Sequence, residues 1–374
     1  MSMAGFAAIP NSSGFDRAMA IPPNRNQAEH FQQAVQQAIA AAAPLTIIGG
    51  GTKRFYGGEG RGEPLSTLGH VGVVEYEPTE LVVTVRSGTR LADLEDLLAE
   101  QGQMLPFEPP RFGQGSTIGG AVACGLSGPR RPYAGAVRDH VLGVRFVNGL
   151  GQVLSMGGQV MKNVAGFDVS RLMAGSLGTL GLLLDISLRV MPMPELEETV
   201  VLEVDSACAL ARMSALAAKC LPITAMSHAE GLMHVRVSGD EAAVSRASAD
   251  LGGSALREGR AFWDDLKNQR LPWFQDKPLW RLSVPPATAQ PDWLGACWMD
   301  WGGAQRWVAG DCAADRVFAW AGKAKGHATL FRSPMAARQV FQPLPAPLLQ
   351  LNRRIKRAFD PHGIFRSRSL YPDD

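Results

Sequence analysis

The chain has 374 residues, enough for two domains with separate cores, and its apolar fraction of 46% is ordinary for a globular protein. A net charge of +2 argues against nucleic acid or an acidic membrane as a partner. The five scattered cysteines include no C-x-x-C pair, which argues against an iron–sulfur cluster or a zinc site and fits a reducing cytoplasm. With no apolar run of transmembrane length and no signal peptide, we expect a cytoplasmic protein without a metal site.

The N-terminal residues 1–25 are rich in proline, asparagine, serine and alanine, and we expect them to form a disordered lead-in. A helix is expected over residues 28–42. Phe31, Val35 and Ile39 recur there at every fourth position, which gives the helix one apolar stripe.

A glycine triplet follows a short predicted strand at residues 45–48. Gly49, Gly50 and Gly51 would present backbone N–H groups to a phosphate. The triplet is not a dinucleotide-binding fingerprint of the Rossmann type, because the third glycine of that pattern is missing. The nearby Lys53 is either a counter-charge to a pyrophosphate or an ordinary solvated lysine, and the sequence leaves both open.

Residues 113–139 form a second glycine-rich stretch, with seven glycines among small and hydroxyl residues. Glycine allows positive φ and lets another molecule approach the backbone closely. Because Ser116, Thr117 and Ser127 add hydroxyl donors, we interpret the stretch as a cofactor loop and not merely a set of tight turns. It is not a P-loop, since no lysine follows Gly120.

Several regular elements surround these glycine segments. A helix is expected at 91–100, and strands are expected at 81–85, 141–147, 152–155 and 182–190. The strands at 141–147 and 152–155 flank an Asn-Gly hairpin signal. In the last strand we expect one apolar face, formed by Leu184, Ile186, Leu188 and Val190.

The glycine motifs end at about residue 195, and strand-like and helical runs then alternate up to about residue 332. We expect a second α+β domain here, with an antiparallel sheet and helices on one face. Its strands are expected at 200–204, 232–237 and 279–284, and its helices at 207–218, 241–251 and 312–321. A basic helical turn lies near the C-terminus, within residues 349–371.

Three segments together resemble one known family: GGGTKRFYG, TIGGAVACGLSGPRRPYAGAVRDHVLGVRFV and KNVAGFDVSRLMAGSLGTLGLLLDISLRVMPMP. In this order and spacing they are similar to FAD-binding domains of the vanillyl-alcohol oxidase (PCMH) type, especially the FAD-binding subunits of bacterial glycolate oxidase. The resemblance implies an α+β fold: a two-part PCMH-type FAD-binding domain at 26–194, an α+β cap domain with an antiparallel sheet at 195–332, and a C-terminal segment at 333–374 that returns to the FAD domain. The family's Asn-Pro-Gly turn is replaced here by Arg366-Ser367-Arg368-Ser369, which puts the flavin contact of that turn in doubt.

The resemblance also implies a set of FAD-binding residues: Gly49, Gly50, Gly51, Thr52, Lys53, Gly115, Ser116, Thr117, Gly119, Gly120, Ser127, Gly128, Tyr133, Gly178, Thr179, Leu180 and Gly181. Tyr133 contacts the flavin ring or fills the core, and the sequence leaves both open. Covalent relatives attach FAD through a histidine or cysteine. Since Thr52 and Lys53 occupy the candidate positions, we expect non-covalent FAD, with Cys124 a buried small side chain.

No catalytic residue can be named from the sequence. The nearest pair of histidines in the cap, His228 and His234, does not match the histidine motif of metal-dependent relatives, and we expect both to be structural or surface residues. Arg236 and Arg281 are candidate carboxylate anchors or simply solvated arginines.

The first hypothesis of function is a FAD-dependent subunit that oxidises a small 2-hydroxy acid, such as glycolate to glyoxylate. The resemblance implies two partners, a sibling FAD-binding glycolate oxidase subunit and an iron–sulfur subunit, with at most peripheral membrane association through the complex. The tryptophan-rich stretches 273–280 and 293–307 are candidate docking surfaces. The alternatives are a non-catalytic FAD-binding assembly subunit, a stand-alone FAD-dependent 2-hydroxy-acid dehydrogenase, and, by fold analogy alone, a nicotinamide-using reductase.

Overall fold

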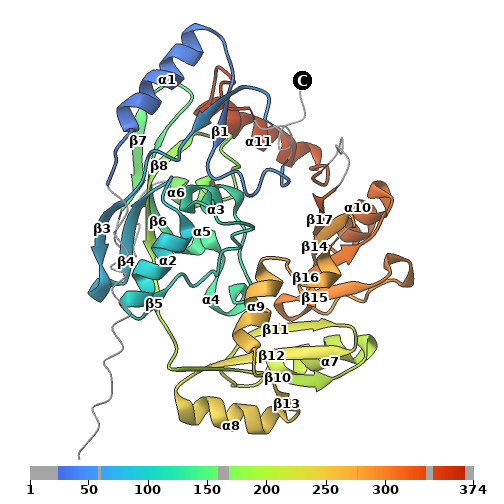
Figure 1. Ribbon diagram of the computed structural model, residues 1–374. Helices are drawn as coiled ribbons and strands as arrows, with labels where there is room; N and C mark the ends of the chain where they lie inside the picture. The colour runs from blue at the N-terminus through green and yellow to red at the C-terminus, as the bar shows by residue number, and fades with distance from the viewer. Residues whose placement is uncertain (1–23, 58–59, 159–167, 276, 334–339, 367–374) are drawn as a thin grey trace, which may run out of the picture.

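The computed structural model describes residues 24–57, 60–158, 168–275, 277–333 and 340–366 (Figure 1). Of the expected lead-in only Asn24 and Arg25 lie inside these ranges, and the N–H of Arg25 donates to the Val71 carbonyl at 2.8 Å. Residues 162–167 of the third family-like segment and residues 367–369 of the atypical C-terminal stretch lie outside them.

The N-terminal half is built around a five-stranded antiparallel sheet of order β3-β4-β8-β6-β7. Its strands are β3 (Val73–Glu77), β4 (Val82–Arg86), β8 (Leu182–Arg189), β6 (Val141–Val147) and β7 (Val153–Gly157). The predicted hairpin is confirmed, because β6 and β7 pair from Val147↔Val153 onwards. Strand β3 was not predicted, since most of its side chains are exposed and it carries no apolar run.

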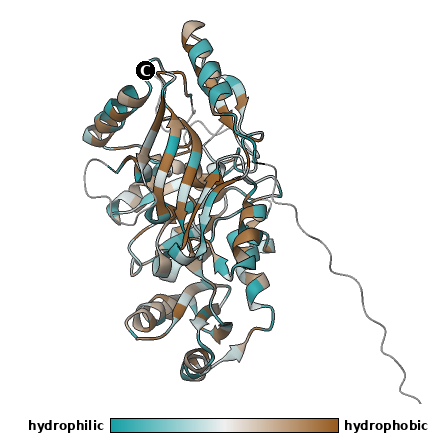
Figure 2. Cartoon of the chain, turned by 90° about the vertical axis from the view of Figure 1, so that its left-hand side faces the viewer, coloured by the Kyte–Doolittle hydropathy of each residue, from teal (hydrophilic) through white to brown (hydrophobic). Residues whose placement is uncertain are grey.

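Two apolar clusters lie on the two faces of this sheet. One contains Leu91, Leu94 and Leu98 of helix α2 (Leu91–Glu100), whose bounds agree with the prediction. The other contains Phe31 and Val35 of helix α1 (Ala28–Ala40). Because both faces are covered, the central strands carry apolar residues on both sides, and brown bands recur along them in Figure 2.

The single apolar face predicted for residues 182–190 is interrupted by a β-bulge. The β6–β8 ladder pairs Phe146 with Leu183 and Arg145 with Asp185, so Leu184 is an extra residue on β8. Leu184 therefore joins the cluster of α1, whereas Ile186 packs in the cluster of α2. The prediction that Leu184 shares a face with Ile186 is wrong.

Shorter elements of this half surround the sheet. They are β1 (Leu45–Ile48), β2 (Glu63–Ser66), η1 (Pro78–Glu80), β5 (Gln103–Met104), α3 (Ile118–Cys124), α4 (Arg131–Ala134), α5 (Val137–His140), α6 (Val169–Met173) and β9 (Met191–Pro192). Strands β1 and β2 form a parallel pair that leads into the glycine triplet.

The C-terminal helix α11 (Ala346–Phe359) lies near strand β1, although the two elements are at opposite ends of the sequence (Figure 1). The ammonium of Lys356 donates to the carbonyls of Thr179 and Phe365, at 2.7 and 2.6 Å. The N–H of Leu45 donates to the Ile364 carbonyl at 2.7 Å. These bonds fasten the end of the described chain to strand β1 and to the loop that precedes β8.

The C-terminal half contains an eight-stranded antiparallel sheet of order β13-β10-β12-β11-β15-β16-β14-β17. Its strands are β10 (Leu196–Glu203), β11 (Ile223–Ala229), β12 (Leu232–Gly239), β13 (Ser254–Ala255), β14 (Leu279–Ser283), β15 (Cys297–Asp300), β16 (Gln305–Ala309) and β17 (His327–Arg332). The predicted α+β class with an antiparallel sheet is confirmed. Strands β11, β13, β15, β16 and β17 were not predicted.

Helices cover this sheet unevenly. Helices α7 (Ser206–Ala217), α8 (Glu241–Leu251) and α10 (Ala314–Lys323) pack on one face, as predicted. Helix α9 (Gly259–Lys267) packs on the opposite face, where the indole N–H of Trp263 donates to Thr199 at 2.9 Å. The prediction of helices on one face is therefore wrong for α9. Three 3₁₀ helices complete this half: η2 (Pro272–Phe274), η3 (Asp292–Leu294) and η4 (Trp301–Gly303).

The face that carries α9 also packs against the N-terminal half. An aromatic cluster there joins Phe55, Tyr56 and Phe112 to Trp307 and Phe331 of the eight-stranded sheet. The tryptophan-rich stretches are therefore largely core, and they are poor docking surfaces. Their buried members are Trp280, Trp298, Trp301 and Trp307. None of the described helices combines the length and apolar character that a membrane crossing needs.

Candidate functional site

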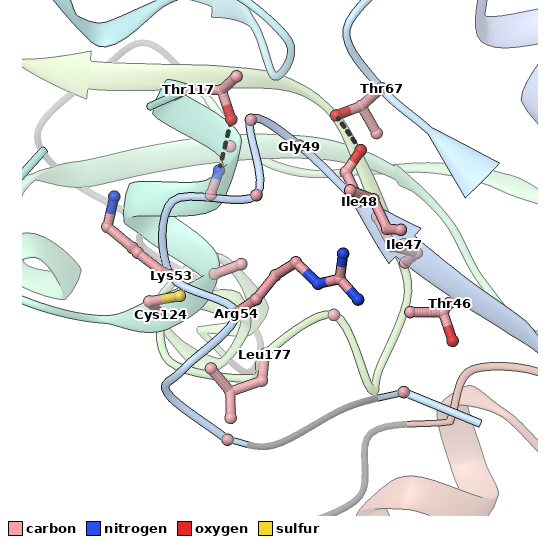
Figure 3. Close-up of a pocket in the computed structure, with 18 of the residues that line it drawn as sticks. Thr46, Ile47, Ile48, Gly49, Lys53, Arg54, Thr67, Thr117, Cys124 and Leu177 are labelled. Atoms are coloured by element: carbon pink, nitrogen blue, oxygen red, sulfur yellow. Dashed lines mark hydrogen bonds between the residues drawn. The ribbon is translucent and has the colours of Figure 1, made fainter. Parts of the chain in front are cut away.

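A cavity of about 390 Å³ lies between strand β1, the start of helix α3 and the loop that precedes β8 (Figure 3). The fold brings three distant glycine segments together around it. The predicted site residues that line the cavity are Gly49, Gly50, Gly51, Thr52, Lys53, Thr117, Gly119, Gly120, Gly178 and Gly181.

Four other predicted residues lie directly behind this lining. Gly115 packs against Gly50, and the hydroxyl of Ser116 accepts a hydrogen bond from Lys53 at 2.7 Å. Thr179 donates to the Ser176 carbonyl at 2.7 Å. Leu180, the fourth, is buried in the core beneath the loop. These residues support the cavity wall.

The remaining three predicted residues lie closer to the cap. Ser127 accepts a hydrogen bond from the Val137 N–H at 3.1 Å, and the carbonyl of Gly128 accepts one from the Trp301 indole at 2.9 Å. Tyr133 is 38% exposed, and burial raises its pKa. None of the three lines the cavity, so their contact with a cofactor stays a prediction.

The glycines are required by close approach of backbone to backbone. A Cβ on Gly50 would lie 1.5 Å from the Gly115 carbonyl oxygen, and one on Gly49 would lie 2.6 Å from Thr117 Oγ1. Gly51 has a φ of +70°, a conformation that strongly favours glycine. Any side chain at the first two positions would push the two glycine segments apart and change the cavity.

Unused hydrogen-bond donors line the cavity. Across the described residues, the backbone N–H groups of residues 49–53 find no acceptor. Thr46 Oγ1 and Ser87 Oγ are buried in the lining and also lack a partner there. Because buried donors are nearly always satisfied, the two orphaned hydroxyls, together with the free N–H groups in the same lining, indicate a ligand rich in hydrogen-bond acceptors.

Positive charge also lines the cavity. Lys53, Arg54 and Arg366 contribute to the lining, whereas none of the described lining residues is an aspartate or glutamate. Figure 3 shows Arg54 extending across the cavity and Lys53 beside Cys124. A cavity with free N–H groups and cations but no carboxylate in its described lining suits an anion such as a pyrophosphate. Arg366 thus brings a charge to the cavity at the start of the atypical C-terminal stretch.

Lys53 is not an ordinary solvated lysine, because its side chain is only 7% exposed. Its ammonium donates to Ser116 Oγ at 2.7 Å and to the Arg111 carbonyl at 3.4 Å. Burial lowers the pKa of Lys53 to about 8. Burial also raises the pKa of the nearby Cys124 thiol to about 11, so this cysteine is neutral near pH 7.

The end of the cavity at Lys53 and Tyr56 faces the cap. Tyr56 lines the cavity and packs on Phe331 of strand β17, with ring centroids 5.2 Å apart. Burial raises the pKa of Tyr56, and the neighbouring Arg281 opposes the rise. Sequence reasoning missed the lining residues Thr46, Arg54, Tyr56, Ser87 and Arg366. Arg54 and Tyr56 belong to the GGGTKRFYG segment and could have been found there.

Arg236 does not serve as a free carboxylate anchor. It is buried, and its guanidinium pairs with Glu108 at 2.9 Å. Arg130 pairs with the same Glu108 at 3.1 Å and with Glu197 at 2.7 Å. Burial alone would raise the pKa of Glu108, but Arg236 and Arg130 hold it at about 2. This ion network joins the loop before α3 to strands β10 and β12 of the cap.

The two cap histidines have structural roles. A ring nitrogen of His228 lies 2.8 Å from the Val204 carbonyl, and His234 stacks on Phe262 with centroids 4.0 Å apart. Within the described ranges no group of three or more histidine, cysteine, aspartate or glutamate side chains is arranged to hold a metal ion.

A family profile described as "FAD binding domain" matches residues 25–157. The glycolate oxidase subunit GlcE of Escherichia coli (strain K12) is 41% identical over 340 residues, which covers 91% of this chain and 96% of that protein. The glycolate oxidase subunit GlcD of Bacillus subtilis (strain 168) is 32% identical over 154 residues, 41% of this chain and 33% of that protein. A D-lactate dehydrogenase of Anaerostipes hadrus is 34% identical over 124 residues, 33% of this chain and 26% of that protein.

A solved structure of alkyldihydroxyacetonephosphate synthase has a TM-score of 0.66 with 16% identity, and covers 92% of this chain and 75% of that chain. At this identity the likeness concerns the fold alone.

Proposed function

From the premise that this chain belongs to the family of FAD-dependent oxidoreductases that includes the glycolate oxidase subunit GlcE, and that acts on CH–OH groups, we propose a function. The chain is the FAD-binding subunit of a complex that oxidises glycolate, a small 2-hydroxy acid, to glyoxylate. The observation that carries the proposal is the cavity, in which residues 49–53 have free N–H groups and the described lining has no carboxylate.

The residues present fit FAD. The N–H groups of residues 49–53 would hold the pyrophosphate, and the orphaned hydroxyls of Thr46 and Ser87 would donate to other polar atoms of the cofactor. Lys53, Arg54 and Arg366 offset its negative charge. When bound, FAD supplies an acceptor for the two electrons released as a CH–OH group becomes C=O. The protein binds the cofactor, orients it towards the substrate and excludes water from the site.

We further propose that FAD is held without a covalent bond. Thr52 and Lys53 stand where covalent relatives carry a linking residue, and neither is a histidine or cysteine. Cys124 is the one cysteine in the described lining, and the raised pKa of its thiol disfavours the thiolate.

The proposed partners are a sibling FAD-binding subunit and an iron–sulfur subunit. The support is chemical: the chain has no C-x-x-C pair, and its described part holds no metal-binding group, so an iron–sulfur cluster that takes electrons from the flavin would belong to another chain. The names of the relatives GlcE and GlcD both contain the word subunit, which also favours an assembly. We place the complex in the cytoplasm, with any membrane contact made through partners.

Purification of a tagged chain from its native host tests this proposal. We expect a second flavoprotein and an iron–sulfur protein to be recovered with it, and the assembly to reduce an artificial dye with glycolate. The tagged chain expressed alone should reduce the dye far more slowly. A lone chain that oxidises glycolate as fast as the assembly would contradict the proposal.

A non-catalytic assembly role is the second candidate, favoured by the contacts of His228 and His234, which engage both members of this histidine pair within the cap. Rapid mixing of the anaerobic assembly with glycolate separates the two. The proposal predicts that the flavin of this chain is reduced, whereas the assembly role predicts that only the sibling's flavin is reduced.

A further inference from the structure

A group of basic side chains gathers where helix α4, helix η4 and strand β14 meet. The guanidinium carbon of Arg131 lies 4.3 Å from a ring centroid of Trp301, and that of Arg281 lies 5.3 Å from a ring centroid of the same side chain. One arginine comes from the FAD-binding half and the other from the cap, so the pair spans the boundary between them. Trp301 itself is buried.

Neither guanidinium has a carboxylate partner in the part of the chain that the structure describes. Arg281 donates from Nε to Gln305 at 2.7 Å, and no side-chain hydrogen bond of Arg131 is found there. The contrast with neighbouring arginines is sharp, because Arg130 and Arg236 are both paired with Glu108. The fold therefore pairs Arg130 and Arg236 directly with an acid, whereas Arg131 and Arg281 have no carboxylate within ion-pair distance in the described part of the chain.

Like charges are held together at this place. Burial lowers the pKa of Arg131, and Arg281 lowers it further. Burial also lowers the pKa of His327 on strand β17, and the same two arginines add to the effect. Two acids act on the pair without forming an ion pair, Asp139 on Arg131 and Asp300 on Arg281. Asp300 is buried with its pKa raised to about 7, and its carboxylate already accepts from the backbone N–H of Trp301 at 2.7 Å. Holding two cations together without a directly paired anion costs free energy, which a bound anion would offset.

The basic group also adjoins the FAD cavity. Arg281 lies next to Tyr56, which lines the cavity at its cap-facing end. An anion at Arg131 and Arg281 would therefore lie beside this end of the cavity, at the boundary that the cap closes. The sequence indicated Arg281 as a candidate anchor but gave no reason to single out Arg131.

We propose that Arg131 and Arg281 form a carboxylate-binding subsite for the small 2-hydroxy acid, with Trp301 as the surface that holds both guanidinium groups in place. Planar guanidinium groups recognise carboxylates through pairs of charge-assisted hydrogen bonds. This inference rests on the proposed function and deepens it, because it assigns substrate binding to this chain and not only to a sibling subunit.

Oxalate, a dicarboxylate that a flavin does not oxidise under these conditions, is a suitable probe. Binding is followed in the flavin-loaded chain by the visible difference spectrum and, independently, by tryptophan fluorescence. We expect saturable binding to the unmodified chain and a Kd raised about tenfold or more in both Arg131→Gln and Arg281→Gln. The matched control is Arg316→Gln, since Arg316 also stacks on a tryptophan, Trp293, at 4.2 Å but lies away from the cavity. It should bind oxalate normally.

Flavin content and circular dichroism establish that each variant is folded. Arg281→Lys keeps the charge but loses the paired, planar N–H donors of the guanidinium, so it should give an intermediate Kd. The subsite is refuted if the unmodified chain does not bind oxalate, or if folded Arg131→Gln and Arg281→Gln variants bind it as Arg316→Gln does. In that case normal flavin content leaves the proposed function standing. A chain without flavin would instead overturn the proposed function, while the fluorescence titration would still test the subsite.

Discussion

Single residues decide what the cavity can accept. Gly50 allows its segment to touch Gly115, and Gly49 allows contact with Thr117, so N–H groups rather than side chains form this wall. Lys53 is the one buried cation of the described lining, without an ion pair in that part of the chain. A ligand with several anionic oxygens satisfies both the free N–H groups and this charge.

Gly120→Val should weaken FAD retention about tenfold or more without unfolding the chain. A Cβ at Gly120 would lie 3.2 Å from Thr117 Oγ1, and the two valine methyl groups would take up room in the cavity that Gly120 lines. Flavin content per chain is compared with circular dichroism. The control is Gly239→Val, because Gly239 has nothing within 4 Å of its would-be Cβ. Equal flavin in both variants would show that the segment is only a turn.

Lys53 should make the free energy of unfolding of the FAD-free chain depend on pH. Burial places its folded pKa at about 8, below the ordinary 10.5, so between these values the unfolded chain binds more protons. The free energy of unfolding therefore rises with pH, by about 2 kcal/mol from pH 7 to pH 9.5. Urea titrations should show this rise in the free energy of unfolding for the unmodified chain, and a smaller rise for Lys53→Met. The exposed Lys323→Met is the control, and an unchanged rise in Lys53→Met would count against the buried charge.

At the scale of elements, an ion network fastens the cap to the FAD-binding half. Glu108 lies between Arg130 and Arg236, and Glu197 of strand β10 completes the network from the cap side. Because both arginines are buried, their charges depend on this carboxylate. The network therefore fixes how the cap sits over the cap-facing end of the cavity.

Glu108→Gln should lower the free energy of unfolding by about 3–5 kcal/mol, since it leaves two buried arginines with one acid fewer. Asp93→Asn, which breaks the exposed Arg90–Asp93 pair on helix α2, should change it by less than about 1 kcal/mol. Chemical denaturation of both variants makes the comparison. Similar losses of stability in the two variants would mean that the ion network stabilises the fold no more than a surface ion pair does.

Elements set by local signals were predictable, and those set by distant partners were not. Helices α2 and α8 have the bounds expected from their apolar periodicity. Strands β15 and β16 were missed because their role comes from pairing across the cap sheet. The glycine segments marked the cavity in the sequence, but hydroxyls such as Ser87 carry no local sign of facing it. Likewise, nothing in the sequence indicates that Arg130 forms an ion pair with Glu108 whereas Arg131, in the described part of the chain, does not.

At the scale of the whole molecule, two antiparallel sheets enclose the cofactor cavity and the basic group beside it. The N-terminal half supplies the glycine segments, and the eight-stranded sheet lies beside it in Figure 1. Aromatic side chains of that sheet pack against Phe55 and Tyr56 of the N-terminal half. Helix α11 brings the end of the described chain back to β1, where Arg366 joins the lining. The cofactor cavity and the proposed substrate subsite beside it thus meet at the boundary between the two halves, and only the folded chain creates this boundary.

The central claim is that the cavity at residues 49–53 holds one FAD without a covalent bond. The most direct test is the visible absorption spectrum of the purified chain before and after acid precipitation. We predict a yellow protein with about one flavin per chain, all of it released to the supernatant as FAD. A colourless protein that takes up no added FAD, or flavin retained in the pellet, would contradict the account.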